Sequence, residues 1–254
     1  MPHAQAGTPV GVFDHVTTRA SDRGASERFY ETVLDAVGIP GTYSNEQVAA
    51  WRDFGVCQTD RTHPVTHGLH VAFAVPSRDH VDRFWQAGTR AGYRDDGVPG
   101  PRPEYGDDYY GGFLLDHDGN SAEAVHHDSL RTGGLIDHLW IRVANVAASR
   151  AFYTTIARHA GFEMRFDSPE RARFRGSSGS FSILAGAKPT EHLHLAFRAA
   201  DQAGVDAFHA AATGAGHRDH GGTGERPAYG GAYYAAYVLD PDGNNVEVVC
   251  RDGG

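Results

Sequence analysis

The sequence has few of the features that mark secreted and membrane-spanning proteins. Its 254 residues include two cysteines, Cys57 and Cys250, and no C-x-x-C pair. Neither a disulfide framework nor a cysteine-rich zinc site is therefore expected. The apolar runs are far shorter than the ~20 residues of a membrane span, and the first residues do not resemble an export signal. These absences predict a protein of the cytoplasm.

Basic clusters are lacking as well. The formal net charge is -9, and no segment gathers the lysines and arginines that a nucleic acid requires. The expected partner is a small-molecule substrate, with neither nucleic acid nor membrane. Histidine is the unusual residue, because 16 of them are present, and this excess prompts a search for metal ligands.

The chain contains the same pattern twice. The segment "YYGGFLLDHDGNSAEAV" at 109–125 returns as "YYAAYVLDPDGNNVEVV" at 233–249, with nine of 17 positions identical. Other segments, among them "LHVAF" and "LHLAF", repeat at an offset of 123 or 124 residues. The duplication predicts a first unit at 10–128, a short linker at 129–134 that contains a Gly pair, and a second unit at 135–252.

Each unit divides into two halves with the same order of elements. The alternation at 12–20 predicts a strand, and Ser21 or Asp22 can cap the helix that follows. Short apolar runs separated by turn residues come next, and the unit closes with two strands around an Asp-Gly turn. The expected fold is α+β, with four βαβββ modules in two tandem repeats that form cupped, barrel-like mixed sheets.

Three strands of each unit carry a histidine or a glutamate. Because an unpaired buried carboxylate is costly, the glutamates need partners. Successive side chains of a strand point to opposite faces, so these residues lie away from the helices. If the sheets curve into cups, these side chains converge on the concave side. The residues are His15, His70 and Glu123 in the first unit, and His138, His194 and Glu247 in the second.

Two imidazoles and one carboxylate make a facial triad with positions left open for substrate or oxygen. Fe(II) is the favoured occupant, with Mn, Zn, Ni and Co as alternatives. The competing interpretation is that the histidines are hydrogen-bonded structural residues and that the glutamates are solvated. The combination of three ligand types on three strands favours a divalent metal, which would also balance the charge of the glutamates.

Further residues of the cup follow from the alternation. Arg19 and Arg142 lie four residues after the first histidine of each unit and could clamp a carboxylate or phosphonate. Alternatively, they balance acidic surface. Trp140 could stack on an aromatic substrate, or it could belong to the core.

Tyrosines and the remaining histidines complete the set. One tyrosine of each pair, 109–110 and 233–234, could donate a hydrogen bond to a metal-bound oxygen, although tyrosine also packs well in strands. The candidates for a catalytic role are Tyr110, Tyr234 and Tyr237. The histidines expected at the surface are His126, His127, His217 and His220.

These motifs resemble the vicinal oxygen chelate superfamily, which includes glyoxalase I, extradiol dioxygenases, fosfomycin resistance transferases and bleomycin-binding resistance proteins. The resemblance covers nearly the whole chain and rests on the two "DH" pairs, on "LHVAF" and "LHLAF", and on the "D-x-DGN-x-x-E" endings. It implies paired βαβββ modules and a metal in the cup that chelates two adjacent oxygens of the substrate. It also implies that the six residues of the two triads are the metal ligands.

The sequence departs from each activity of the superfamily. Glyoxalase I takes a fourth ligand from a strand that here reads "FGVCQ" or "FSILAG", without an acid; Asp53 lies nearby in the first unit only. Extradiol dioxygenases carry a catalytic histidine where this chain has Ala228 and Tyr229. Their remaining pattern is matched by Tyr237, Asp240, Pro241, Gly243 and Glu247.

The resemblance implies a metal-dependent oxygenase of dioxygenase type as the first choice. A glyoxalase-type lyase or isomerase is the second. The rival from another class is a metal-free protein that sequesters an antibiotic in its cup.

The sequence leaves the pairing of the modules open. Contiguous pairing would gather the ligands of one unit at one site. Swapped pairing, as in several small family members, would join the first histidine of each unit with the second histidine and the glutamate of the other unit. One chain would then imitate the homodimer of a single-unit relative, and either a monomer or a homodimer is expected.

Overall fold

The computed structural model describes residues 12–128 and 133–251. Parts of the predicted segments lie outside the described residues, namely 10–11, 129–132 and 252. Within the described ranges, no helix combines the length and the apolarity needed to cross a bilayer.

The element order repeats βαβββ four times, which confirms the predicted modules. Module 1 contains β1 (Phe13–Ala20), α1 (Arg23–Asp35), β2 (Tyr43–Ser44), β3 (Val48–Trp51) and β4 (Phe54–Gln58). Module 2 contains β5 (Leu69–Ala74), α2 (Arg78–Arg90), β6 (Arg94–Pro101), β7 (Tyr110–Leu115) and β8 (Ser121–His126). Module 3 contains β9 (Ile136–Val143), α3 (Val146–Ile156), the short helix η1 (Ala157–His159), β10 (Glu163–Asp167), β11 (Arg171–Arg175) and β12 (Ser180–Ala185). Module 4 contains β13 (His194–Arg198), α4 (Gln202–Gly214), β14 (Arg218–Glu225), the short helix η2 (Pro227–Tyr229), β15 (Tyr234–Leu239) and β16 (Asn245–Cys250).

Side-chain caps start three of the four long helices. Of the two residues predicted to cap α1, Asp22 does so by accepting a hydrogen bond from the Ala25 amide at 2.9 Å. Asn145 and Asp201 cap α3 and α4 in the same way, at 3.0 and 2.8 Å. Each cap satisfies an amide that the first turn of a helix leaves without a partner.

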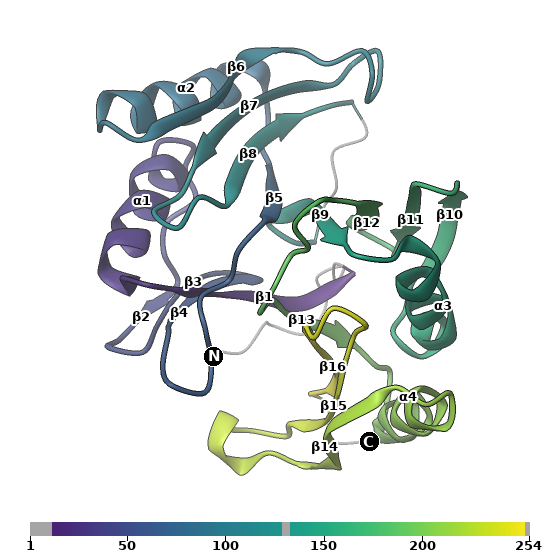
Figure 1. Cartoon of the computed structure of the whole chain (residues 1–254). Helices are drawn as coiled ribbons and strands as arrows, with labels where there is room; N and C mark the ends of the chain where they lie inside the picture. Colours follow the sequence, from purple (N-terminus) through teal and green to yellow (C-terminus); the bar gives the residue numbers. More distant parts are fainter. Residues whose placement is uncertain (1–11, 129–132, 252–254) are drawn as a thin grey trace.

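The modules pair across the two repeats (Figure 1). One sheet has the order β14-β15-β16-β13-β1-β4-β3-β2 and joins modules 1 and 4. The other has the order β10-β11-β12-β9-β5-β8-β7-β6 and joins modules 2 and 3. The antiparallel pairs β1–β13 and β5–β9 join the modules at the centre of each sheet. The chain therefore adopts the swapped arrangement, and each sheet needs both repeats.

Both sheets are curved and open. Among the described strands, the end strands of each sheet do not pair with each other, so neither sheet closes into a barrel. The helices lie on one face of each sheet. Helix α1 contacts α2, and α3 contacts α4. Their buried residues, such as Phe29 and Phe152, pack on the apolar side chains of the strands and form the core. The alternate side chains of the same strands are left for the concave face.

The repeated "D-x-DGN" turn fixes the two strands that carry the second histidine and the glutamate. Asp116 accepts hydrogen bonds from the Asn120 amide at 2.8 Å and from the buried Tyr30 hydroxyl at 3.1 Å. Asn120 in turn accepts from the Leu69 amide at 3.1 Å and donates to the Thr66 carbonyl at 3.0 Å. The turn before β8 is thus tied to the start of β5. The second copy repeats these bonds through Asp240, Asn244, Tyr153, Leu193 and Thr190.

Candidate metal centres

The swapped pairing brings the six predicted ligands into two groups. We call His15, His194 and Glu247 site I, and His70, Glu123 and His138 site II. Within each group, one ligand atom from each residue lies within 4.8 Å of the other two. The sequence-based expectation that these residues converge on a concave face agrees with this geometry.

Strand register sets the geometry of site II. In the parallel pair β5–β8, Ala72 lies opposite Glu123, and in the antiparallel pair β5–β9 it lies opposite His138. His70 is two residues away on the same face. The Glu123 Oε2 atom lies 3.0 Å from His70 Nε2 and 3.5 Å from His138 Nε2. All three side chains are buried.

Site I repeats this arrangement with small differences. The Glu247 Oε2 atom lies 3.1 Å from His194 Nε2 and 3.8 Å from His15 Nε2. The two Nε2 atoms are 3.0 Å apart. Glu247 is 1% exposed, so its carboxylate depends on these partners.

A carboxylate orients the first histidine of each site. His15 Nδ1 donates to Asp14 at 2.8 Å, and His138 Nδ1 donates to Asp137 at 2.8 Å. Burial alone would raise the pKa of Asp14, but hydrogen bonds from His15 and Arg251 lower that pKa below its ordinary range. An ionised carboxylate on Nδ1–H leaves the Nε2 lone pair free, which is the tautomer that binds a metal.

The second histidines are held differently at the two sites. His70 Nδ1 lies 3.1 Å from the Ser121 hydroxyl, which itself donates to Asp96 at 2.7 Å. His194 Nδ1 lies 2.9 Å from Asn245 Nδ2, while the Asn245 Oδ1 atom is buried without a partner in the described part of the chain. If the Asn245 amide is rotated by 180°, its Oδ1 atom accepts a hydrogen bond from His194 Nδ1–H. The His194 Nε2 lone pair is then free, as at His70.

Burial and charge shift the pKa values of the second histidines and of Glu247. Burial lowers the pKa of His70 and of His194, and it outweighs the neighbouring glutamate, which acts in the opposite direction. Burial would raise the pKa of Glu247, but hydrogen bonding and charge from His194 lower it overall. Neutral imidazoles beside an ionised carboxylate are the protonation states that metal ligation requires.

A tyrosine supports each glutamate. The Tyr109 hydroxyl donates to Glu123 Oε1 at 2.6 Å, and the Tyr233 hydroxyl donates to Glu247 Oε1 at 2.6 Å. Burial, together with the glutamate charge, raises the pKa of both tyrosines far above its usual range. Both hydroxyls therefore keep their protons and fix Oε1, while Oε2 faces the histidines.

The donor set fits a divalent metal. In site II the lone pairs of two Nε2 atoms face the Glu123 carboxylate, and acceptors at 3.0 and 3.5 Å repel one another unless a cation lies between them. Donors that share an ion at metal–ligand distances of about 2.1 Å are separated by roughly 3 Å when they occupy adjacent positions. Four of the separations, at 3.0–3.5 Å, are close to this size, and the fifth, from His15 Nε2 to Glu247 Oε2, is longer at 3.8 Å.

The structure separates the tyrosines that were predicted as catalytic. Tyr110 donates to Asp82 on α2 at 2.9 Å, and Tyr234 donates to Asp206 on α4 at 2.8 Å. Both hydroxyls therefore lie on the helix side, and their predicted place at the sites is corrected to Tyr109 and Tyr233. Tyr237 lies on the concave face, paired directly with Glu247 in the β15–β16 ladder.

The predicted substrate-binding residues lie near the histidines. Arg19 donates to the Gln58 carbonyl at 3.1 Å, and Arg142 donates to the Gly68 carbonyl at 3.2 Å. Trp140 packs beside site II, with ring-centroid distances of 5.1 Å to His70 and 6.0 Å to His138.

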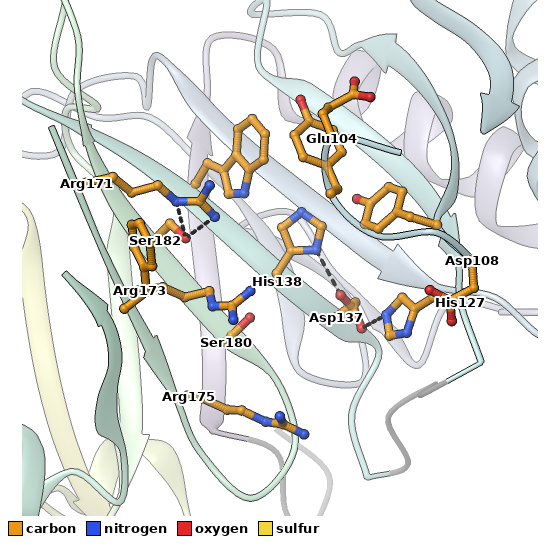
Figure 2. Close-up of a pocket in the computed structure, with 14 residues that line it drawn as sticks. Glu104, Asp108, His127, Asp137, His138, Arg171, Arg173, Arg175, Ser180 and Ser182 are labelled. Atoms are coloured by element: carbon orange, nitrogen blue, oxygen red, sulfur yellow. Dashed lines mark hydrogen bonds and ion pairs between the residues drawn. The ribbon is translucent and has the colours of Figure 1, made fainter. Parts of the chain in front are cut away.

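Trp140 also lines a cavity of about 430 Å³ that reaches His138. Figure 2 shows this cavity, with three arginines of β11 along one side and Glu104 and Asp108 across from them. The residues predicted from the sequence do not include Arg171, Arg173 and Arg175. The signal that could have found them is the alternation in "RARFR" at 171–175.

His127 was predicted at the surface, and this is wrong. It is 7% exposed, lines the cavity, and contacts Asp137 Oδ1 through Nε2 at 3.0 Å (Figure 2). Asp137 thereby joins His127 to His138. At site I the residue in the place of His127 is Arg251, whose guanidinium binds Asp14 at 2.6–3.0 Å.

Asp53 is not a fourth ligand. Its buried carboxylate accepts hydrogen bonds from the Leu135 amide at 2.8 Å and the Ile136 amide at 3.5 Å. Burial raises its pKa to about 6. Asp53 thus ties the β3–β4 turn to the start of β9 in the other sheet, and it joins neither group of converging ligands.

Comparison with known proteins places this fold. Glyoxalase I from Zea mays matches with a TM-score of 0.68 over 94% of this chain and 92% of that chain, at 18% identity. A candidate dioxygenase from Bacillus subtilis subsp. subtilis str. 168 matches with a TM-score of 0.62 over 96% of this chain and 87% of that chain, at 11% identity. At these identities the likeness shows the shared fold alone. No curated protein matches the chain in sequence.

The sequence itself matches a family model in both repeats. The model describes the Glyoxalase/Bleomycin resistance protein/Dioxygenase superfamily, and it matches residues 12–124 and 135–248. These two matches cover most of the chain and confirm the resemblance drawn from the motifs. The chain belongs to the Glyoxalase/Bleomycin resistance protein/Dioxygenase superfamily.

Proposed function

We propose that the protein is a divalent-metal-dependent oxygenase that acts on a small molecule with two adjacent oxygens. The observation that carries this proposal is the three-donor composition of both sites. Among the described residues, each group of converging ligands holds two histidines and one glutamate, with no fourth carboxylate. Three protein ligands leave room for a bidentate substrate and for one more small ligand.

When bound, the metal supplies Lewis acidity and, if it is Fe(II), also redox chemistry with dioxygen. The residues of the chain prepare the site for it. His70, His138 and Glu123 would hold the ion at site II, and Asp137 orients the His138 ring from behind. Tyr109 keeps the carboxylate in place and retains its own proton. Trp140 and the rest of the cavity wall would orient the substrate.

Site II is the proposed catalytic site, because the cavity of about 430 Å³ reaches it through His138. Site I is proposed to bind metal as well. Fe(II) remains the favoured ion, since two histidines and one carboxylate with open positions suit non-haem iron. The cytoplasmic location stays a prediction from cysteine usage.

Glyoxalase-type lyase chemistry is the alternative. It needs a general base that removes a proton from carbon beside a carbonyl. The buried carboxylates nearest to site II are already engaged: Glu123 accepts the Tyr109 hydroxyl and faces the two histidines as a candidate ligand, and Asp137 binds His127 and His138. The absence of a free buried base among these residues favours the oxygenase.

Anaerobic reconstitution tests the proposal. The protein is loaded in parallel with Fe(II), Mn, Co, Ni and Zn, and bound metal is measured by elemental analysis. We expect about two equivalents per chain, and oxygen uptake by the Fe(II) form with members of a catechol panel. Turnover of an α-hydroxycarbonyl substrate without oxygen uptake would instead support the lyase. Failure of all five metals to bind would support a metal-free sequestering protein.

A further inference from the structure

Three arginines of β11 form a row on the cavity wall of site II. In "RARFR", Ala172 and Phe174 are fully buried in the core. The alternate residues point to the other face and line the cavity (Figure 2). We call Arg171, Arg173 and Arg175 the arginine row.

The guanidiniums of the row have no carboxylate partner among the described residues. In the described ranges of the chain, none of the three guanidiniums lies within 4.0 Å of a carboxylate. Arg171 donates to the Ser182 hydroxyl at 3.0 and 3.3 Å and lies 5.6 Å from the centre of the Trp140 ring. Burial, followed by the charge of Arg173, lowers the pKa of Arg171.

The acidic residues of the cavity lie on the opposite side. Asp137 is engaged by two histidines, and Asp108 accepts the Asp128 amide at 2.7 Å. Figure 2 shows Glu104 and Asp108 across the cavity from the row. The cavity is therefore polarised, with a cationic wall on β11 and acids facing it, and an anionic ligand would be directed toward β11.

The fold does not require Arg171 and Arg173. The strand register places Val48 and Ala50 of β3 where β11 has Arg171 and Arg173. The module 1 copy of the same strand thus carries small apolar side chains on this face. Arg171 and Arg173 therefore distinguish this wall from its module 1 copy, and guanidiniums without a carboxylate partner beside a cavity are suited to binding an oxyanion.

We propose that the arginine row binds an oxyanion group, carboxylate or phosphoryl, of the substrate of site II. The substrate is then a small anion whose chelating oxygens face His138 while its oxyanion contacts β11. The chelating half of this statement rests on the proposed function. The anion site is independent of it, because it requires no metal.

Titration calorimetry on the metal-free full chain tests the row. Inorganic phosphate and malonate are the two probes, and their relative affinity shows which oxyanion is preferred. We expect one equivalent to bind, with affinity that falls as salt is added. Arg173→Gln and Arg171→Gln should each weaken binding roughly tenfold, because each removes a charge-assisted contact.

Arg165→Gln is the matched control. Arg165 lies on the neighbouring strand β10, pairs with Glu163, and does not line the cavity. Binding that is as weak in Arg165→Gln as in Arg173→Gln, or unchanged in all three variants, would overturn the row as an anion site. Metal content measured on the same samples keeps the two proposals apart. Anion binding without metal uptake would contradict the oxygenase proposal and support the anion site. Metal uptake without anion binding would contradict the anion site alone.

Discussion

Site I and site II arise from two copies of one sequence and can be compared residue by residue. Both keep two histidines, a glutamate, a tyrosine on that glutamate and an aspartate behind the first histidine. These residues depend on the strand register and on the "D-x-DGN" turn, which both copies retain. The donor set is therefore preserved by the same contacts that hold the fold.

The surroundings of the two sites differ much more. Trp140 at site II corresponds to Thr17 at site I. Arg171 and Arg173 correspond to Val48 and Ala50, and His127 corresponds to Arg251. These side chains lie on concave faces that no helix covers, so they can change without disturbing the core. The duplication thus separates the parts that would hold a metal from the parts that would select a substrate.

The largest expected effect distinguishes the two glutamates. Glu123→Gln removes the charged ligand of site II, and we expect oxygenase turnover to fall about 10³-fold, in the range of removing an essential electrostatic group. Glu247→Gln should remove one equivalent of metal with turnover within a few-fold of the wild type. Elemental analysis and oxygen uptake on both variants check this. Equal loss of turnover in the two variants would show that site II is not the sole catalytic site.

The second prediction concerns Asp53, whose place in module 3 is taken by Ser180. A carboxyl with a folded pKa of about 6, above the ordinary value of 3.8, favours the protonated form in the fold. Its contribution to stability is complete below pH 4 and is lost as the pH rises through 6. The free energy of unfolding should therefore fall by up to about 3 kcal/mol toward pH 7.

Asp53→Asn keeps an acceptor for the Leu135 amide and has no charge to bury. Urea unfolding should show this variant more stable than the wild type at pH 7 and close to it at pH 4. Parallel pH curves for the two proteins would mean that Asp53 has the same pKa in the folded and unfolded chains, which would contradict the prediction. Asp107→Asn, which removes a carboxylate at an exposed position, is the control variant measured beside Asp53→Asn.

The ligand triads could be predicted because strand alternation and the repeat carry the same information. "HLWIRV" places His138 on the face away from the helix, whatever its neighbouring strand is. For the same reason the sequence left the pairing open, since both pairings put the same residues on the same faces. Which strand lies beside β5 depends on contacts between modules, and these are not local in the sequence.

The errors involve neighbouring residues at strand ends. Tyr109 and Tyr110 differ by one position, and the start of the β7 register decides which of them meets Glu123. His127 follows β8 directly, and its burial depends on Asp137 from the other repeat. The arginine row had a clear alternating pattern, but its importance follows only from the cavity that β11 lines.

The third prediction tests the aspartates behind the first histidines. Asp137→Asn should weaken metal binding at site II by about 10- to 100-fold, because the carboxylate fixes the ligating tautomer of His138. Asp14→Asn should do the same at site I. Competition with a chelator resolves two classes of bound Co(II), and each variant should shift one class only. A shift of both classes in one variant would show that the two sites are coupled.

The smallest expected effect concerns Trp140, which lines the cavity beside site II. Trp140→Thr copies Thr17 of the first repeat into site II and removes a ring that contacts His70, His138 and Arg171. If the ring stacks on an aromatic substrate, KM should rise roughly three- to tenfold, the size of an aromatic contact, with metal content unchanged. Trp140→Phe should keep most of the affinity. If Trp140 serves only as packing, steady-state kinetics would show the same KM for all three proteins, and only the thermal midpoint of Trp140→Thr would fall.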